Sequence, residues 1–183
     1  QAAQMSVSRS VKAPSEDASI NIVGLINCIK ASKEAQAKKF IFASSGGCLY
    51  GEVGRPANED SPQEPESPYG ISKSAGEGYV KYFSSEAFQC ISLRYSNVYG
   101  PGQNPNAEAG VIAIFSKKLF KNKQAVIFGT GGQVRDYVHV EDVARANMLA
   151  SEKELGAFTA INVGTGQGTS VAQLAFLIQQ AGE

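Results

Sequence analysis

The stretch Ser67-Pro68-Tyr69-Gly70-Ile71-Ser72-Lys73 opens an amphipathic helix and places a tyrosine and a lysine one helical turn apart. A separation of four residues puts two side chains on the same face of a helix. The unperturbed pKa of a phenol is about 10, and a nearby cation lowers it because it favours the phenolate. The spacing therefore predicts Tyr69 as an acid/base and Lys73 as its activating cation. The alternative is an exposed pair without a function, since Tyr-x-x-x-Lys occurs by chance in many helices.

The helix that begins here is predicted over about 68–87, with Pro68 in its first turn, where a missing N–H costs nothing. One of its faces is apolar and consists of Ile71, Ala75, Tyr79, Tyr82 and Phe83. This face is either a homodimer contact or ordinary core, and the sequence leaves both interpretations open.

Two continuous apolar runs flank this helix, at 39–43 and 90–95, and each ends in a turn of small or polar residues, at 44–51 and 96–102. Continuous apolar runs are typical of parallel strands that are buried on both faces. Ligands of such sheets bind at the carboxyl ends of the strands. We therefore expect both turns and the start of the Tyr69 helix to converge on one crevice.

The rest of the chain continues the alternation of strands and helices. Further helices are predicted over about 15–31, 110–121, 141–150 and 170–180, and further strands over 125–128 and 160–163, with a proline-rich loop over 52–67. This alternation predicts an α/β layered fold with a mainly parallel sheet, and one domain over 1–183.

The composition argues against several classes of protein. The 17 basic and 17 acidic residues cancel, so neither nucleic acid nor a membrane surface is an expected partner. No apolar run is long enough to span a membrane, and the first residues carry no signal core, so the predicted location is the cytoplasm. The three cysteines form neither a disulfide framework nor a metal cluster, and no metal site is predicted.

Several motifs occur in a fixed order along the chain: Ala2-Ala3-Gln4, Ser44-Ser45 to Tyr50-Gly51, Tyr69-x-x-x-Lys73, Arg94-Tyr95-x-Asn97-x-Tyr99-Gly100-Pro101, Arg135-Asp136-Tyr137-x-His139-Val140-x-Asp142 and Asn162-Val163-Gly164. In these motifs the chain resembles the extended short-chain dehydrogenase/reductases, in particular the NAD-dependent nucleotide-sugar epimerases and dehydratases. The resemblance implies a Rossmann-like, doubly wound fold, truncated at its N-terminal side, with part of a small substrate-binding subdomain.

The resemblance also implies roles for individual residues. Tyr69 matches the acid/base, and Lys73 matches the residue that lowers its pKa and binds the nicotinamide ribose of NAD. The positions that line the dinucleotide are Ala2, Ala3, Ser44 and Tyr95, and Asn21 matches a helix asparagine that helps to hold this site. The positions that face a nucleotide-sugar are Asn97, Phe128 and Arg135, where a guanidinium suits phosphate oxygens. A surface Arg135 paired with Asp136 is the alternative.

The chain departs from the family pattern first in its glycines. The family's Gly-rich phosphate-binding turn lies after the first strand and is absent here, and neither 129–132 nor 164–169 has the required spacing and context. We therefore expect the chain to be the later part of a longer protein. Alone, it should leave a sheet edge unpaired and bind NAD weakly.

The second departure is Gly46, at the position where the family carries a substrate-binding hydroxyl. Ser45, Cys48 or a water could take that role. The dehydratases of the family carry an Asp-Glu pair just after this position, whereas this chain has Gly47 and Cys48.

The resulting hypothesis is NAD-dependent epimerisation at C4 of a UDP-hexose, of the UDP-glucose/UDP-galactose type, through a 4-keto intermediate. A nucleotide-sugar dehydrogenase, reductase or dehydratase, or a non-catalytic dinucleotide-binding protein, is the alternative.

Overall fold

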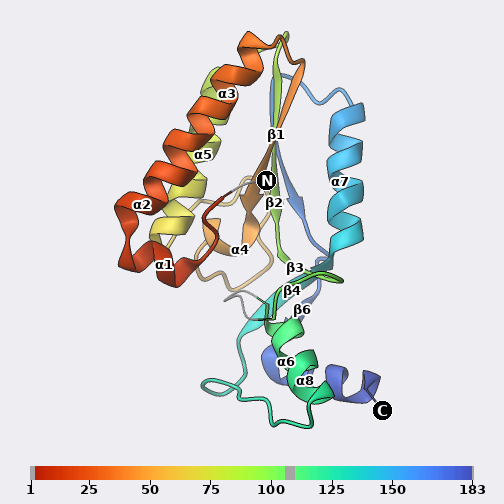
Figure 1. The fold of residues 1–183 in the computed structure, drawn as a ribbon. Coiled ribbons are helices and arrows are strands. Elements are labelled where there is room, and N and C mark those ends of the chain that lie inside the picture. The colour runs from red at the N-terminus through yellow and green to blue at the C-terminus, as the bar shows by residue number, and fades with distance from the viewer. Residues whose placement is uncertain (1–2, 106–109, 183) are drawn as a thin grey trace.

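A three-stranded parallel sheet forms the centre of the chain, whose structure is a computed structural model that describes residues 3–105 and 110–182. The strands β1 (Lys39–Ser45), β2 (Gln89–Tyr95) and β5 (Phe158–Val163) lie in the order β1-β2-β5. One face of the sheet is covered by α2 (Pro14–Ala18), a π-helical turn (Ser19–Val23), α3 (Gly24–Glu34) and α5 (Pro68–Phe83). The other face is covered by α7 (Val140–Glu152), as Figure 1 shows. Helices on both faces of a parallel sheet confirm the predicted Rossmann-like α/β fold.

The core lies on both sides of β2, which explains its continuous apolar sequence. Successive side chains of a strand point to opposite faces of its sheet. Accordingly, Phe42 and Cys90 pack with Leu25, Ile29, Val80 and Phe88 under α3 and α5. Ile91 and Leu93 pack with Val138, Val143 and Ala150 on the α7 side. The central strand is thereby fixed from both faces, and so are the loops at its carboxyl end.

A second, smaller sheet begins where the chain leaves β2. After Ser96 the chain enters β3 (Asn97–Tyr99), which pairs in parallel with β4 (Val134–His139), and β4 pairs antiparallel with β6 (Gly168–Ser170). Two helices, α6 (Val111–Phe120) and α8 (Val171–Ala181), pack against each other beside this sheet and form the lower lobe in Figure 1. The motif that contains Asn97 therefore connects the two parts of the molecule.

Some predicted elements are shifted and one is wrong. The helix predicted over 15–31 extends from Pro14 to Glu34 with a π-helical turn inside it, and the helix predicted over 68–87 ends at Phe83, before a tight turn that pairs Ser85 with Phe88. The strand predicted over 125–128 does not form. Its apolar residues instead line a cavity, and β4, which follows it, is already paired on both edges, with β3 and β6. The short helices α1 (Val7–Lys12) and α4 (Gly46–Leu49) were not predicted.

Within the described part of the chain, β1 pairs only with β2, so its outer edge has no strand partner, as expected from the sequence. No helix among these residues has the length and apolar character needed to cross a membrane. The three cysteines are free thiols, with Cys28 exposed and Cys90 buried.

Candidate active site

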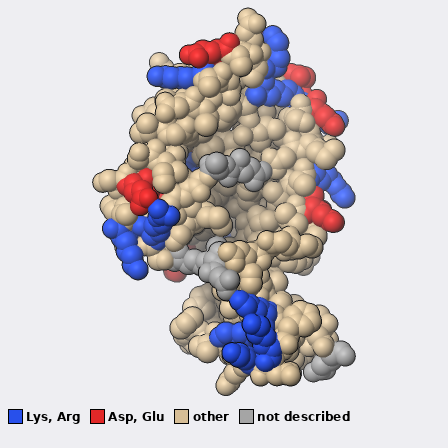
Figure 2. Space-filling view, viewed as in Figure 1, with Lys and Arg blue, Asp and Glu red and all other residues tan. Residues whose placement is uncertain are grey.

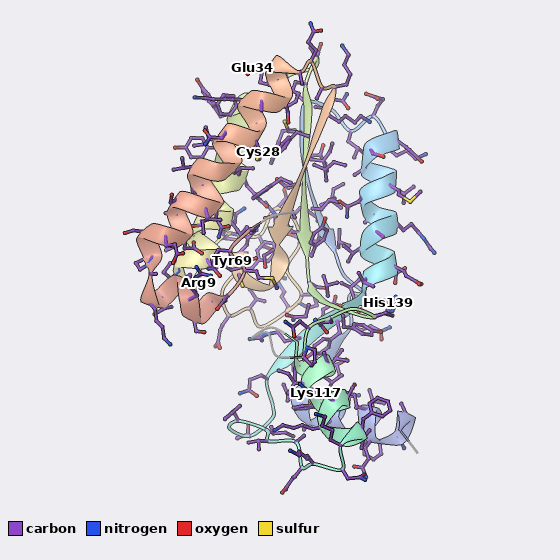
Figure 3. The ribbon with its side chains drawn as sticks, in the orientation of Figure 1. Arg9, Cys28, Glu34, Tyr69, Lys117 and His139 are labelled. Carbon is purple, nitrogen blue, oxygen red and sulfur yellow. The ribbon has the colours of Figure 1, made fainter. Side chains whose placement is uncertain are left out.

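Tyr69 lies at the start of α5 (Figure 3), and Lys73, one turn further along the helix, contacts β1 near its carboxyl end. The Ser67 hydroxyl caps this helix by accepting from the Gly70 N–H at 3.1 Å, and the Tyr69 N–H donates to the Ser10 hydroxyl at 3.1 Å. Lys73 is 5% exposed. Its Nζ donates to the Ala43 carbonyl oxygen at 2.8 Å and lies 5.7 Å from the centre of the Tyr69 ring. The structure thus places both side chains where the sheet topology predicts a ligand crevice.

The pKa values of this pair differ from the expectation. Burial raises the pKa of Tyr69 to about 12; the charges of Cys48 and Asp17 act in the same direction, and a hydrogen bond with the Ser45 side chain opposes them. Burial also lowers the pKa of Lys73 to about 8, against the opposite effect of Asp17. The net shift of the Tyr69 pKa is therefore upward, because desolvation dominates, and the lowering effect expected of Lys73 stays a prediction. At neutral pH the phenol is protonated and Lys73 is mainly an ammonium.

Ser45, the last residue of β1, contacts the Tyr69 side chain by this hydrogen bond. The neighbouring Gly46 is packed against β2, where an added Cβ would lie 3.2 Å from the Arg94 carbonyl oxygen and 3.4 Å from that of Tyr95. A larger residue at Gly46 would have to push the α4 turn away from β2. Ser45, one residue before Gly46, stays the candidate for the hydroxyl that Gly46 lacks.

The residues predicted to line a dinucleotide divide into two groups. Ser44 is 4% exposed and its hydroxyl has no hydrogen-bond partner within the protein. The Tyr95 side chain instead lies on the α7 face of the sheet, where its hydroxyl donates to Asn147 Oδ1 at 3.0 Å. Arg94, which precedes it, occupies the α5 face. Tyr95 can therefore line a dinucleotide only through its backbone, at the end of β2.

The Asn21 side chain binds the backbone of the N-terminal segment. Its Nδ2 donates to the Gln4 carbonyl oxygen at 2.8 Å, and its Oδ1 accepts from the Gln4 N–H at 3.0 Å. The amide is thus engaged within the protein and holds Gln4, next to the exposed Ala3. Ala2 lies outside the described residues. Asn21 can support a cofactor site through this segment, whereas its own amide is already paired.

Asp17 is a residue of this site that the sequence motifs did not identify. It is 1% exposed and accepts a hydrogen bond from the Ser72 hydroxyl at 2.6 Å, next to Lys73. The signal that could have identified it is the Asp17-x-x-x-Asn21 spacing, which places both polar side chains on one helix face.

A cavity of about 520 Å³ is lined by residues of β3, α6, β4 and the segment between α6 and β4. Asn97, Phe128 and Arg135, the three residues predicted to face a nucleotide-sugar, all line this cavity, as does Lys118. Basic side chains gather on the lower lobe, to which α6 contributes Lys117 and Lys118 (Figure 2). Asn97 also reaches the α4 turn, since its Oδ1 lies 3.8 Å from where a Cβ on Gly47 would be. Asn97 therefore connects the cavity to the α4 turn, which follows Ser45.

The alternative in which Arg135 pairs with Asp136 is wrong. The Arg135 guanidinium donates to the Val134 carbonyl oxygen, while the Asp136 carboxylate accepts from the Thr165 N–H at 3.0 Å and the Gly166 N–H at 2.8 Å. The glycine-rich turn after β5 therefore binds a carboxylate of the protein itself. Its N–H groups are not free for the phosphates of a dinucleotide, as the glycine spacing had already indicated.

Comparisons with known proteins identify the family of the chain. Residues 1–164 match the profile of the NAD dependent epimerase/dehydratase family. The UDP-glucose 4-epimerase of Mycolicibacterium smegmatis is 43% identical over 94% of this chain and 56% of its own length. The structure of UDP-glucose 4-epimerase from Thermotoga maritima with UDP-glucose has a TM-score of 0.93 and 45% identity, over 98% of this chain and 59% of that one. The Thermus thermophilus UDP-glucose 4-epimerase in complex with NAD has a TM-score of 0.91 and 42% identity, over 100% of this chain and 60% of that one.

The chain thus spans between 56% and 60% of the length of these relatives. The similarity confirms the resemblance noted in the motifs, and it covers the Tyr69 helix, the α4 turn and the Arg135 strand in one continuous match. The chain belongs to the NAD dependent epimerase/dehydratase family.

Proposed function

We propose that the protein containing this chain is an NAD-dependent epimerase that interconverts UDP-glucose and UDP-galactose through a 4-keto intermediate. The observation that carries the proposal is the partly buried Tyr69 phenol, hydrogen-bonded to Ser45 and one helical turn from Lys73, together with a cavity lined by Asn97 and Arg135. The similarity to UDP-glucose 4-epimerases at 42 to 45% identity supports the same reaction.

The residues at the end of β1 fit the nicotinamide half of NAD. The Ser44 hydroxyl is buried without a partner, which is unusual unless a ligand group pairs with it. Ser44, Tyr69 and the Lys73 ammonium would hold the nicotinamide and its ribose. When bound there, NAD supplies the hydride acceptor and donor for the sugar carbon.

Tyr69 would move the proton of the C4 hydroxyl. Because its pKa is raised to about 12, the phenol is in the protonated form, from which a proton can pass to a keto oxygen. Accepting a proton requires the phenolate, and Ser45 is the side chain whose hydrogen bond favours that form. The Lys73 ammonium, 5.7 Å from the ring, adds a positive charge on the same side. Ser45 and Lys73 would therefore support the two directions of proton transfer.

The α4 turn favours epimerisation over elimination of water. Its residues Gly46, Gly47, Cys48 and Leu49 offer no carboxylate beside Tyr69, and elimination needs a base for a second proton. Arg135, Asn97 and Phe128 would bind the nucleotide end in the lower cavity, which leaves the sugar free to turn between the two hydride transfers.

The test is an assay of the protein that contains this chain, supplied with UDP-glucose or UDP-galactose. We expect each sugar to be converted into the same equilibrium mixture without net change in NAD or NADH. Reduction of NAD in step with product would instead identify a dehydrogenase. Binding of NAD and UDP-sugar without turnover would identify a non-catalytic protein.

A homodimer is the second part of the proposal. Ile71, Tyr79 and Tyr82 on α5 are 54%, 41% and 80% exposed, and Val23 on the neighbouring π-helical turn is 53% exposed, so this face is not core within the chain. We assign it to a contact with a second copy. The free thiols fit a reducing compartment, and we place the protein in the cytoplasm.

Replacing Tyr82 by glutamate should convert such a dimer into monomers, because the change buries a charge in an apolar contact. Sedimentation velocity on the same full protein measures the change. Phe120→Glu is the matched control, since Phe120 is 86% exposed on α6 in the lower lobe. A Tyr82→Glu protein that sediments like the unchanged dimer would rule out this face.

A further inference from the structure

Asp17 is a buried carboxylate that the proposed reaction does not use. Three side chains donate to it: Gln4 Nε2 at 2.7 Å and Asn21 Nδ2 at 3.0 Å bind Oδ1, and the Ser72 hydroxyl at 2.6 Å binds Oδ2. Within the described residues it forms no direct ion pair. A buried carboxylate is costly unless its oxygens are hydrogen-bonded, and here the protein supplies those bonds from three separate segments. Such an arrangement suggests a role for the charge itself.

The position of Asp17 connects the N-terminal segment to α5. It precedes the π-helical turn that carries Asn21, and π-helical turns are frequent at functional sites. Asn21 holds the backbone of Gln4, while Ser72 is adjacent in sequence to Lys73. One carboxylate thereby fixes three elements around the catalytic pair.

The negative charge of Asp17 also affects the pKa values of both Lys73 and Tyr69. Lys73 is buried, which lowers its pKa to about 8, and the negative charge of Asp17 counteracts this effect by favouring the ammonium. The same charge favours the protonated form of Tyr69. Both effects follow from the sign of a nearby charge.

We propose that Asp17 is a positioning residue, the buried counter-charge that keeps Lys73 an ammonium next to Tyr69. The role of Asp17 in catalysis rests on the proposed epimerase function, whereas its effect on the pKa of Lys73 does not. Without this counter-charge the ammonium would give up its proton at a lower pH, and Tyr69 would then lose the positive charge beside it.

Other charged groups near Asp17 are occupied elsewhere. Arg9 of α1 and Glu16 of α2 form an ion pair at the surface, and Lys12 of α1 is exposed. Glu77 of α5 pairs with Arg94. Among the described residues on the elements packed around Asp17, the buried Lys73 and the partly buried Tyr69 are thus the ionisable groups left to respond to it.

Asp17→Asn tests the charge with little change in shape. The asparagine oxygen can accept from Gln4 and Asn21, and its amide can donate to the Ser72 oxygen. We expect the pKa of Lys73 to fall by about one unit, as expected for loss of a nearby opposite charge. NMR titration of the protein with isotope-labelled lysine measures it, with the resonance assigned through Lys73→Arg. The high-pH limb of the kcat profile should move to lower pH by the same amount, because it reports loss of the ammonium.

Two further variants separate charge from structure. Ser72→Ala removes one hydrogen bond but keeps the charge, and it should leave the Lys73 titration unchanged. Asp17→Glu keeps the negative charge and should give a Lys73 pKa close to that of the wild type. If Asp17→Asn does not fold, Asp17→Ser provides a smaller neutral residue for the same comparison. A neutral variant whose Lys73 titrates as in the wild type overturns the proposal. The titration needs no substrate, so a wild-type protein without epimerase activity would refute the proposed function alone.

Discussion

Tyr69→Phe is expected to lower the kcat of the proposed epimerase by about 10²- to 10⁴-fold, the usual contribution of a positioned general acid/base. The substitution removes only the hydroxyl that hydrogen-bonds to Ser45 and leaves the ring packed beside Lys73. Substrate binding depends on the lower cavity with Asn97 and Arg135, so KM should change much less than kcat.

The measurement is steady-state interconversion of UDP-glucose and UDP-galactose by the full protein, with NAD binding measured separately by calorimetry. Tyr79→Phe serves as the control, because Tyr79 lies on the same helix but is 41% exposed and outside the site. If Tyr69→Phe and Tyr79→Phe both retained the wild-type kcat, Tyr69 would not be the acid/base.

The second large effect is expected on stability, at the buried ion pair between Arg94 and Glu77. Their side chains are 6% and 5% exposed, with Arg94 Nη2 at 2.7 Å from Glu77 Oε2. Removing one partner leaves the other charge buried and unpaired, which costs about 3–5 kcal/mol. Arg94→Met or Glu77→Gln should therefore lower the free energy of unfolding by about that amount.

Urea denaturation of the full protein tests this expectation. The double variant Arg94→Met/Glu77→Leu should be more stable than either single charge deletion, because no buried charge is left alone. Arg9→Ala is the control, since it breaks an ion pair with Glu16 whose side chains are 58% and 46% exposed, and such pairs contribute less than about 1 kcal/mol. If Arg9→Ala and Arg94→Met lowered the free energy of unfolding equally, the expected cost of an unpaired buried charge would be contradicted.

The same ion pair anchors the proline-rich loop beside the site. Arg94 Nη1 donates to the Tyr50 hydroxyl at 2.7 Å and to the Glu59 carbonyl oxygen at 3.0 Å. Gln63 Nε2 donates to Glu77 at 2.9 Å. Residues of the loop over 52–67 are thus tied to the buried Arg94 and Glu77, which places this loop next to α4 and α5.

The sequence by itself determined the α/β class, the buried strands β1 and β2 and the helix that carries Tyr69 and Lys73. These features depend on spacing within one element: a continuous apolar run, a capped helix start and a four-residue separation. It also indicated through Gly46 that another hydroxyl was needed near Tyr69, and Ser45 lies in hydrogen-bonding contact with it.

Only the tertiary structure decided which way side chains point and how deeply they are buried. Asp17 meets Ser72 across 55 residues of sequence, and Tyr95 meets Asn147 across 52. The pairing of β4 on both edges leaves 125–128 as a cavity wall instead of a strand. Burial, and not the neighbouring lysine, sets the direction of the Tyr69 pKa. Desolvation and long-range pairing arise from packing between distant segments, and local spacing carries no information about them.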